Sequence, residues 1–403
     1  MTSDHQSAAQ NWRLAPAVVA GLLLAVTAAP ALAEEPEAEE KAEKEEKEEK
    51  EYDFLERPIG DNWVLSPVIL PIVAPELGVA LAIGGIATFS AEPENEELPR
   101  STLGLFLVPS TRGSIGADAD LEGFFADDNR RVELKFEYDD GPSDYWGVGY
   151  DIAREIGESD DDVTEFERRA FELPAVLNFR VGKSLFAGLN VDYIDMQVDE
   201  RSPTQEASPE FLAYGDEITL VGAGVQITFD SRDVTLNPYS GWYLNAKATF
   251  YRDGLGSDEE FEIYEVDYRG FYQIGRPGRT LAWQLFGQLA QGEVPWIRKP
   301  KVGSSSDLRG YTDGRFIDDA AAWALVEYRH MTNSELWKLG RNGFVAWAGV
   351  GFIGEDFGDF GGNHLPNFGV GYRLEVQDRT NLRLDVGWGY DEVGVYLNFN
   401  EAF

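Results

Sequence analysis

The sequence predicts an all-β fold, a 16-stranded antiparallel transmembrane β-barrel. Apolar and polar residues alternate over many segments of about ten residues, the length of a tilted membrane-crossing strand. In one segment Leu382, Leu384 and Val386 alternate with Arg383 and Asp385. Trp and Tyr often end the apolar faces, as they do at membrane interfaces. The opposite faces carry Gly, amide and charged residues, which suits a watery bore.

The first 33 residues have the pattern of a cleaved secretory signal. Arg13 precedes an apolar run over residues 15–29, and a small-x-small site at residues 31–33 follows. The run is shorter than the roughly 20 apolar residues of a membrane helix. Residues 34–58 form an acidic low-complexity linker, and residues 59–403 form the barrel. We expect export to the bacterial outer membrane.

Composition excludes several classes of protein. The net charge of −38 argues against a nucleic-acid partner, because phosphates attract Lys and Arg. The sequence has no Cys, which excludes disulfides, thiolate metal sites, a Cys nucleophile and a lipidated Cys after the signal. No cofactor is implied by any motif.

Sixteen segments are candidate strands, and an even number places both ends of the barrel in the periplasm. Several periplasmic connections are then tight, among them those at 182–183 and 378–380. The longest connections, at 140–162, 199–213 and 293–318, fall outside the cell. The candidate strands are 62–72, 77–90, 100–111, 115–126, 130–139, 163–179, 183–198, 214–230, 241–253, 259–274, 279–292, 319–330, 342–355, 364–377, 380–390 and 393–403.

Three motifs stand out: a loop tetrapeptide, a periplasmic turn and the C-terminal segment. Together they resemble the bacterial surface antigen family, the sixteen-stranded barrels of the BamA/TamA type, over residues 59–403. The C-terminal residues Phe399 and Phe403 match an outer-membrane insertion signal, and we expect them on the lipid-facing side with Glu401 near the interface. The tetrapeptide is Leu308, Arg309, Gly310 and Tyr311, and the turn motif includes Asp230, Arg232, Asp233, Pro238 and Gly241.

The resemblance implies that the extracellular loop 293–318 inserts into the lumen, with Arg309 bound to acidic wall residues. A guanidinium inside a barrel needs a carboxylate, and Glu327 shares the lumen face of its strand with Arg329. Where the family offers a second acidic residue on the next strand, this sequence has Trp347. Asp385 and Glu375 are the candidate substitutes. The alternative for Arg309 is a solvated loop charge.

The family's function implies a role in outer-membrane protein assembly or in translocation. The implied partners are outer-membrane lipid and lipopolysaccharide, the assembly machinery and periplasmic proteins. Between the signal and the barrel we expect no periplasmic substrate-binding domain. Pro67, Pro71 and Pro75 lie near the first strand and lack a ladder donor, so the seam with the last strand is expected to be weak.

The sequence also bears on two other functions. A passive pore is the alternative, because sixteen strands enclose an aqueous interior unless it is plugged. An outer-membrane hydrolase is disfavoured, since there is no Gly-x-Ser-x-Gly elbow, and His330 and His364 fall at opposite ends of the barrel. Asp356 and Asp359 offer oxygen ligands in a Gly-rich loop, but they do not follow a calcium-loop spacing, and we expect no metal site.

Overall fold

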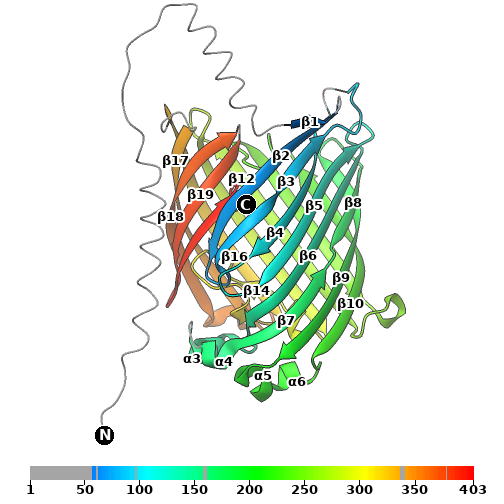
Figure 1. The fold of residues 1–403 in the computed structure, drawn as a ribbon, viewed down its shortest axis with the longest axis vertical. Helices are drawn as coiled ribbons and strands as arrows, with labels where there is room; N and C mark the ends of the chain where they lie inside the picture. Colours follow the sequence, from blue (N-terminus) through cyan, green and yellow to red (C-terminus); the bar gives the residue numbers. More distant parts are fainter. Residues whose placement is uncertain (1–56, 60–61, 96–97, 158–160, 336–340, 378) are drawn as a thin grey trace, which may run out of the picture. The chain divides into compact units, whose positions relative to one another are not determined.

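The computed structural model describes residues 57–403, except 60–61, 96–97, 158–160, 336–340 and 378. The chain divides into two units, residues 1–54 and 55–403. The predicted signal and all but the last two residues of the predicted linker therefore lie outside the described residues. The second unit is a barrel (Figure 1).

Sixteen wall positions form the barrel, so the predicted strand number is confirmed. One position is shared by two short strands, β7 and β8, because both pair with β6 on one side and with β9 on the other. The strands are β2(Trp63–Ala74), β3(Gly78–Phe89), β4(Ser101–Pro109), β5(Ile115–Phe125), β6(Arg130–Asp144), β7(Glu165–Glu172), β8(Ala175–Arg180), β9(Leu185–Glu200), β10(Glu217–Asp230), β11(Gly241–Tyr251), β12(Phe261–Gln273), β13(Arg279–Gly292), β16(Ala320–Glu335), β17(Arg341–Gly354), β18(His364–Gln377), β19(Thr380–Trp388) and β20(Val393–Phe399).

Burial along these strands is inverted relative to a soluble protein. On β10 the side chains of Val225 and Ile227 are exposed, whereas Gln226 and Thr228 are buried. On β18 Val370 is 54% exposed, whereas Arg373 is fully buried. Apolar side chains therefore face outward and polar ones inward, which suits hydrocarbon outside and water within.

Every wall strand runs antiparallel to its neighbours, and β2 meets β20 to close the ring. We call the end of the barrel that carries residues 145–164, 201–216 and 293–319 the loop end, and the opposite end the turn end. The loop end corresponds to the predicted extracellular side. It appears at the bottom of Figure 1.

Short elements decorate both ends. Four small helices lie at the loop end (Figure 1). In the part of the chain that the structure describes, no helix is both long and apolar enough to cross a membrane. The helices are α3(Tyr150–Ile156), α4(Asp161–Thr164), α5(Pro203–Ala207) and α6(Pro209–Leu212), the single turns are η2(Asp253–Leu255), η3(Trp296–Arg298) and η4(Asp359–Gly361), and the remaining strands are β1(Arg57–Ile59), β14(Lys301–Val302) and β15(Phe316–Ile317).

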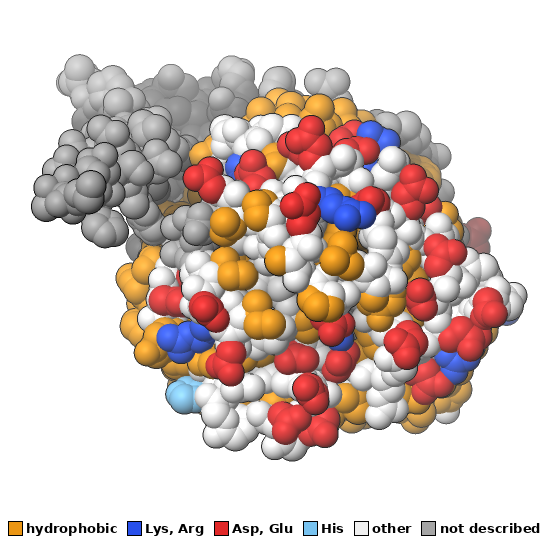
Figure 2. All heavy atoms as spheres, turned by 90° about the horizontal axis from the view of Figure 1, so that it is seen from below, with side chains coloured by type: hydrophobic (Ala, Val, Ile, Leu, Met, Phe, Trp, Pro, Cys, Tyr) orange, Lys and Arg blue, Asp and Glu red, His pale blue; other side chains and the backbone are white. Residues whose placement is uncertain are grey.

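Buried aromatic residues join the loops at the loop end. The ring of Trp296 lies within 6 Å of the rings of Tyr145, Phe166 and Phe211, measured between centroids. A second apolar cluster includes Trp146, from the 145–164 connection. Loop side chains cover the centre of this end (Figure 2). The loop end is thus packed like a small hydrophobic core.

Candidate functional site at the loop tip

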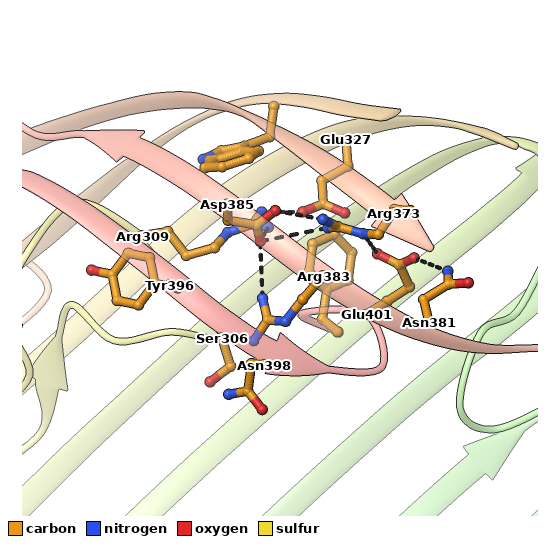
Figure 3. Close-up of polar contacts among 12 residues, drawn as sticks. Ser306, Arg309, Glu327, Arg373, Asn381, Arg383, Asp385, Tyr396, Asn398 and Glu401 are labelled. Atoms are coloured by element: carbon orange, nitrogen blue, oxygen red, sulfur yellow. Dashed lines mark hydrogen bonds and ion pairs between the residues drawn. The ribbon is translucent and has the colours of Figure 1, made fainter. Parts of the chain in front are cut away.

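The connection between β13 and β16 brings Arg309 against the barrel wall. Its guanidinium forms an ion pair with Glu327 of β16, and another with Asp385 of β19 at 2.7 Å (Figure 3). All three side chains are fully buried. Both carboxylates lie on the strand face opposite the exposed apolar one. The two carboxylates therefore take two arms of one guanidinium fork, the geometry that favours Arg over Lys.

Trp347 of β17 occupies the position where the family resemblance implies an acidic residue. The Arg309 guanidinium lies 3.6 Å from the centroid of the Trp347 ring. The indole N–H donates to Asn367 at 2.8 Å, and the Asn367 amide donates to the carbonyl of Arg309 at 2.5 Å. An aromatic face and an amide therefore complete the cradle.

The next residue, Gly310, packs its backbone against β19 and β20. Its φ of 120° is outside the range that L side chains readily adopt, and a β-carbon there would lie 2.8 Å from the carbonyl carbon of Gly387. Its N–H donates to the Tyr396 hydroxyl at 2.9 Å. Only glycine fits this contact.

Tyr311 extends the contact toward β18 and the β19–β20 turn. Its hydroxyl donates to the Pro366 carbonyl at 2.7 Å and accepts from the Tyr390 N–H at 2.8 Å. Burial raises the pKa of the Tyr311 phenol well above its ordinary value. It therefore stays a neutral hydrogen-bonding group at physiological pH.

A second ion pair holds the same loop, and the sequence analysis did not identify it. Arg315 is fully buried and pairs with Glu392 and, at 3.0 Å, with Asp391. The Glu392 carboxylate also accepts from the Thr312 N–H at 2.7 Å. The sequence signal was weak, because Arg315 lies in a polar loop and Glu392 in a turn. The loop is thus fixed at two points six residues apart.

The Arg309 carboxylates belong to a larger buried network (Figure 3). Asp385 also accepts from Arg373 at 2.5 Å and pairs with Arg383 at 3.1 Å. Glu327 also pairs with Arg329 at 2.9 Å. These three arginines alternate with apolar residues along their strands, and that alternation was the available signal. The guanidinium groups of four arginines therefore surround the carboxylates of Glu327 and Asp385.

Glu375, the third candidate partner of Arg309, lies elsewhere. Its carboxylate accepts from Arg341 at 2.7 Å and from the Arg379 N–H at 3.2 Å. In the β18–β19 register Asp385 stands opposite Gly371, four residues along β18 from Glu375 toward the loop end. Glu375 is thus near the turn end, while the tip of the loop reaches only the level of Asp385.

The expected lipid-facing placement of Glu401 and Phe403 is wrong. Phe399 ends β20 on the outward face, and Asn400 then adopts a left-handed φ of 59° that turns the chain inward. Glu401 pairs with Arg373 at 2.9 Å. Phe403 is 6% exposed and lies against Phe271. Periodicity failed here because the strand ends before the sequence pattern does.

The seam between β2 and β20 is the weakest junction of the wall. A single residue pair is in register there, Val73 with Leu397, whereas β2 and β3 share twelve pairs and β19 and β20 share seven. Pro67 and Pro71 lie in β2 and lack N–H donors.

Two carboxyl groups near the loop end of this seam have raised pKa values. Burial, and then repulsion from Asp313, raises the pKa of Glu76 from 4.5 to about 7. Asp307 has a pKa raised to about 6, again by burial first and then by Asp313. Acidic side chains of the loop and of the β2–β3 turn therefore disfavour one another's charged forms.

The remaining candidate residues do not form a catalytic or metal site in the described residues. His330 of β16 stands opposite Phe344 of β17, and His364 of β18 stands opposite Phe352 of β17. Because these two positions of β17 are eight residues apart, the histidines lie about 27 Å apart along the wall. Asp356 accepts from the Gly358 N–H within its own loop. No group of three or more His, Asp or Glu in the described part of the chain could hold a metal ion.

Comparison with known proteins gives one family and several similar folds. The profile of the Omp85 superfamily domain matches residues 112–395. CdiB from Escherichia coli has a TM-score of 0.58 at 11% identity, over 86% of this chain and 63% of that chain. BamA from Haemophilus ducreyi lacking POTRA domains 1-3 has a TM-score of 0.55 at 13% identity, over 83% of this chain and 70% of that chain. Curated protein sequences gave no match. At these identities the structural likeness concerns the fold.

Proposed function

Because this chain belongs to the Omp85 superfamily, we propose that it inserts polypeptides into the bacterial outer membrane or passes them across it. The observation that carries this proposal is the nearly unpaired seam between β2 and β20. A wall that has one weak junction opens there first, because fewer main-chain hydrogen bonds must be broken at that junction than between other wall strands.

The register shows which residues of β2 lie beyond the single pair with β20. Val73 opposes Leu397, so continuing the antiparallel register would place Phe399 opposite Pro71. Beyond that point β20 has turned inward. β1 pairs with β2 at residues 63–65, and among the described residues no strand pairs with residues 66–70 of β2 on this edge. An edge that shares a single residue pair with β20 can accept an incoming strand by main-chain hydrogen bonds.

The packed loop end counts against a passive pore. A stable open channel needs water through both ends, and the aromatic cluster around Trp296 fills the loop end. The connection 293–319 is also anchored at Arg309 and Arg315. The outward apolar face implies contact with outer-membrane lipid and lipopolysaccharide, and the assembly machinery and periplasmic proteins are the proposed partners.

Depletion of the protein in its own bacterium tests the proposal. We expect loss of outer-membrane β-barrel proteins, of secreted polypeptides, or of both, measured by quantitative proteomics of the membrane and the medium. A plasmid-borne wild-type copy should restore them. Depletion that lowers only the uptake of small solutes would contradict the proposal and would favour a pore.

A further inference from the structure

The connection between β10 and β11, residues 231–240, reaches far from its own strands. Arg379, in the turn between β18 and β19, pairs with Asp233 at 2.8 Å and donates to the Asn237 carbonyl at 2.6 Å. Four wall strands, β12, β13, β16 and β17, separate β11 from β18. The contact therefore crosses the turn end of the barrel and does not follow the wall.

The contact is packed as well as charged. The Arg379 guanidinium lies 3.4 Å from the centroid of the Tyr239 ring. Asn237 is 2% exposed and Tyr239 is 5% exposed, although both lie in a connecting segment. A connection that packed against nothing else would expose such side chains to water.

Asp233 both folds the segment and holds it against Arg379. One oxygen of its carboxylate accepts from the N–H groups of Tyr239 at 2.9 Å and Ser240 at 3.2 Å, and the other pairs with Arg379. Burial alone would raise the pKa of Asp233, but these hydrogen bonds outweigh it and leave the pKa below its ordinary value. The carboxylate thus stays charged at neutral pH.

Both ends of the segment are fixed to the wall. Asp230 pairs with Arg232 at 3.0 Å and with Arg131 of β6 at 3.5 Å. Gly241 has a φ of 112°, and a β-carbon there would lie 2.3 Å from the Ser231 carbonyl oxygen. The close approach of the two ends directs the segment between them away from the wall.

The segment also bounds a partly open cavity of about 490 Å³. Arg232 and Thr235 line it together with wall residues such as Glu122, Glu133 and Tyr243. The segment therefore forms part of the boundary of this cavity. Movement of the segment would change access to this cavity.

We propose that residues 231–240 form a strap across the turn end, latched by Asp233 and Arg379, which must release before a polypeptide or large solute enters the bore from that end. The inference does not depend on the proposed function, since a strap would limit access for any cargo. It also assigns roles to the turn-motif residues: Asp230, Arg232 and Gly241 anchor the strap and Asp233 latches it.

The absence of native Cys permits a direct test. A single reporter, Glu133→Cys, is placed in the cavity wall, and its modification by a polyethylene-glycol maleimide is timed on the full chain in detergent. Asp233→Ala or Arg379→Ala should speed labelling about tenfold, because a charge-assisted contact of this kind is worth about that factor. Asp233→Asn keeps an acceptor oxygen for the N–H groups of Tyr239 and Ser240 but removes the charge that pairs with Arg379, and it should also speed labelling.

Arg276→Ala is the matched control, because Arg276 lies in another turn at the same end and donates to the Met331 carbonyl at 2.7 Å. The labelling rate of the Arg276→Ala variant should equal that of the protein that carries the reporter alone. Heat-modifiable migration on gels identifies variants that fail to fold, and only folded variants are timed. Equal rates in the latch variants and the reporter, or equal acceleration by Arg276→Ala, would overturn the strap.

Discussion

The α-carbon of Gly387 lies directly beneath the carbonyl of Arg309, so that a β-carbon at position 387 would stand 1.9 Å from the Arg309 oxygen. The loop tip therefore rests on the bare backbone of β19. Gly310 makes the reciprocal approach from the loop side. This backbone contact sets the depth at which Arg309 meets its two carboxylates.

Gly387→Ala should dislodge the loop tip. The methyl group cannot fit without moving backbone, and overpacking of this kind costs about 1–3 kcal/mol. We expect faster cleavage of residues 293–319 by protease in detergent. Gly361→Ala is the control, since nothing lies within 4 Å of a β-carbon there and cleavage should be unchanged. Equal protection of both variants would contradict the close contact.

Arg309→Ala should destabilise the docked loop more strongly. Removing one partner of a buried ion pair costs about 3–5 kcal/mol, because charge is left uncompensated. Planar-bilayer recordings should show larger or less stable conductance than wild type, and Arg309→Lys should give an intermediate result. Arg201→Ala, which removes an exposed ion pair with Asp216, should leave conductance unchanged. Stable wild-type currents in Arg309→Ala would argue for a solvated arginine.

Tyr396→Phe removes the two hydrogen bonds that the Tyr396 hydroxyl makes to the loop tip. The variant leaves the Gly310 N–H without its acceptor and the Tyr311 carbonyl without its donor at 3.3 Å, and each unsatisfied buried group costs about 1–3 kcal/mol. We expect a lower temperature for the heat-induced gel shift of the folded barrel. Tyr390→Phe is the comparison, because Tyr390 joins the same region through its backbone N–H and its exposed ring. A larger shift in Tyr390→Phe than in Tyr396→Phe would refute the assignment.

Acidification should stabilise the loop end of the seam. The folded-state pKa of Glu76, about 7, lies above its ordinary 4.5, so the native state binds the proton more tightly than the unfolded state. Stability is therefore gained as the pH falls from 7 toward 4.5 and lost as it rises through 7. Protease protection of residues 293–319 should be greater at pH 5.5 than at pH 8.

Glu76→Gln should remove most of this pH dependence and raise protection at pH 8. Glu94→Gln, an exposed carboxylate in the connection before β4, should keep the wild-type dependence. If the two variants follow the same pH curve as wild type, the repulsion between Glu76 and Asp313 is too weak to affect the loop.

Strand number and most strand ends were predictable because outward apolar residues repeat every second position through each strand. β18, for example, begins and ends at the predicted residues 364 and 377. Periodicity carries no information once a strand ends, so the inward turn at Asn400 escaped it.

Strand periodicity likewise predicted the positions of some site residues and not of others. Glu327 and Asp385 could be placed on the inner face by counting along their strands. Which of Asp385 and Glu375 meets Arg309 depends on how deep the loop reaches, and that depth follows from a contact between glycine backbones. The pairing of Arg379 with Asp233 joins residues 146 positions apart through neither strand nor motif spacing.

Cross-linking the seam tests the central claim most directly. Val73→Cys and Leu397→Cys stand directly opposite, at a Cα separation of about 4.5–5.5 Å, within disulfide range. In depleted cells this variant should fail to restore outer-membrane or secreted polypeptides when oxidised and should restore them when reduced. The control lock, Val370→Cys with Val386→Cys between β18 and β19, should restore them in both states. Full function of the oxidised Val73–Leu397 lock would contradict the opening of the seam.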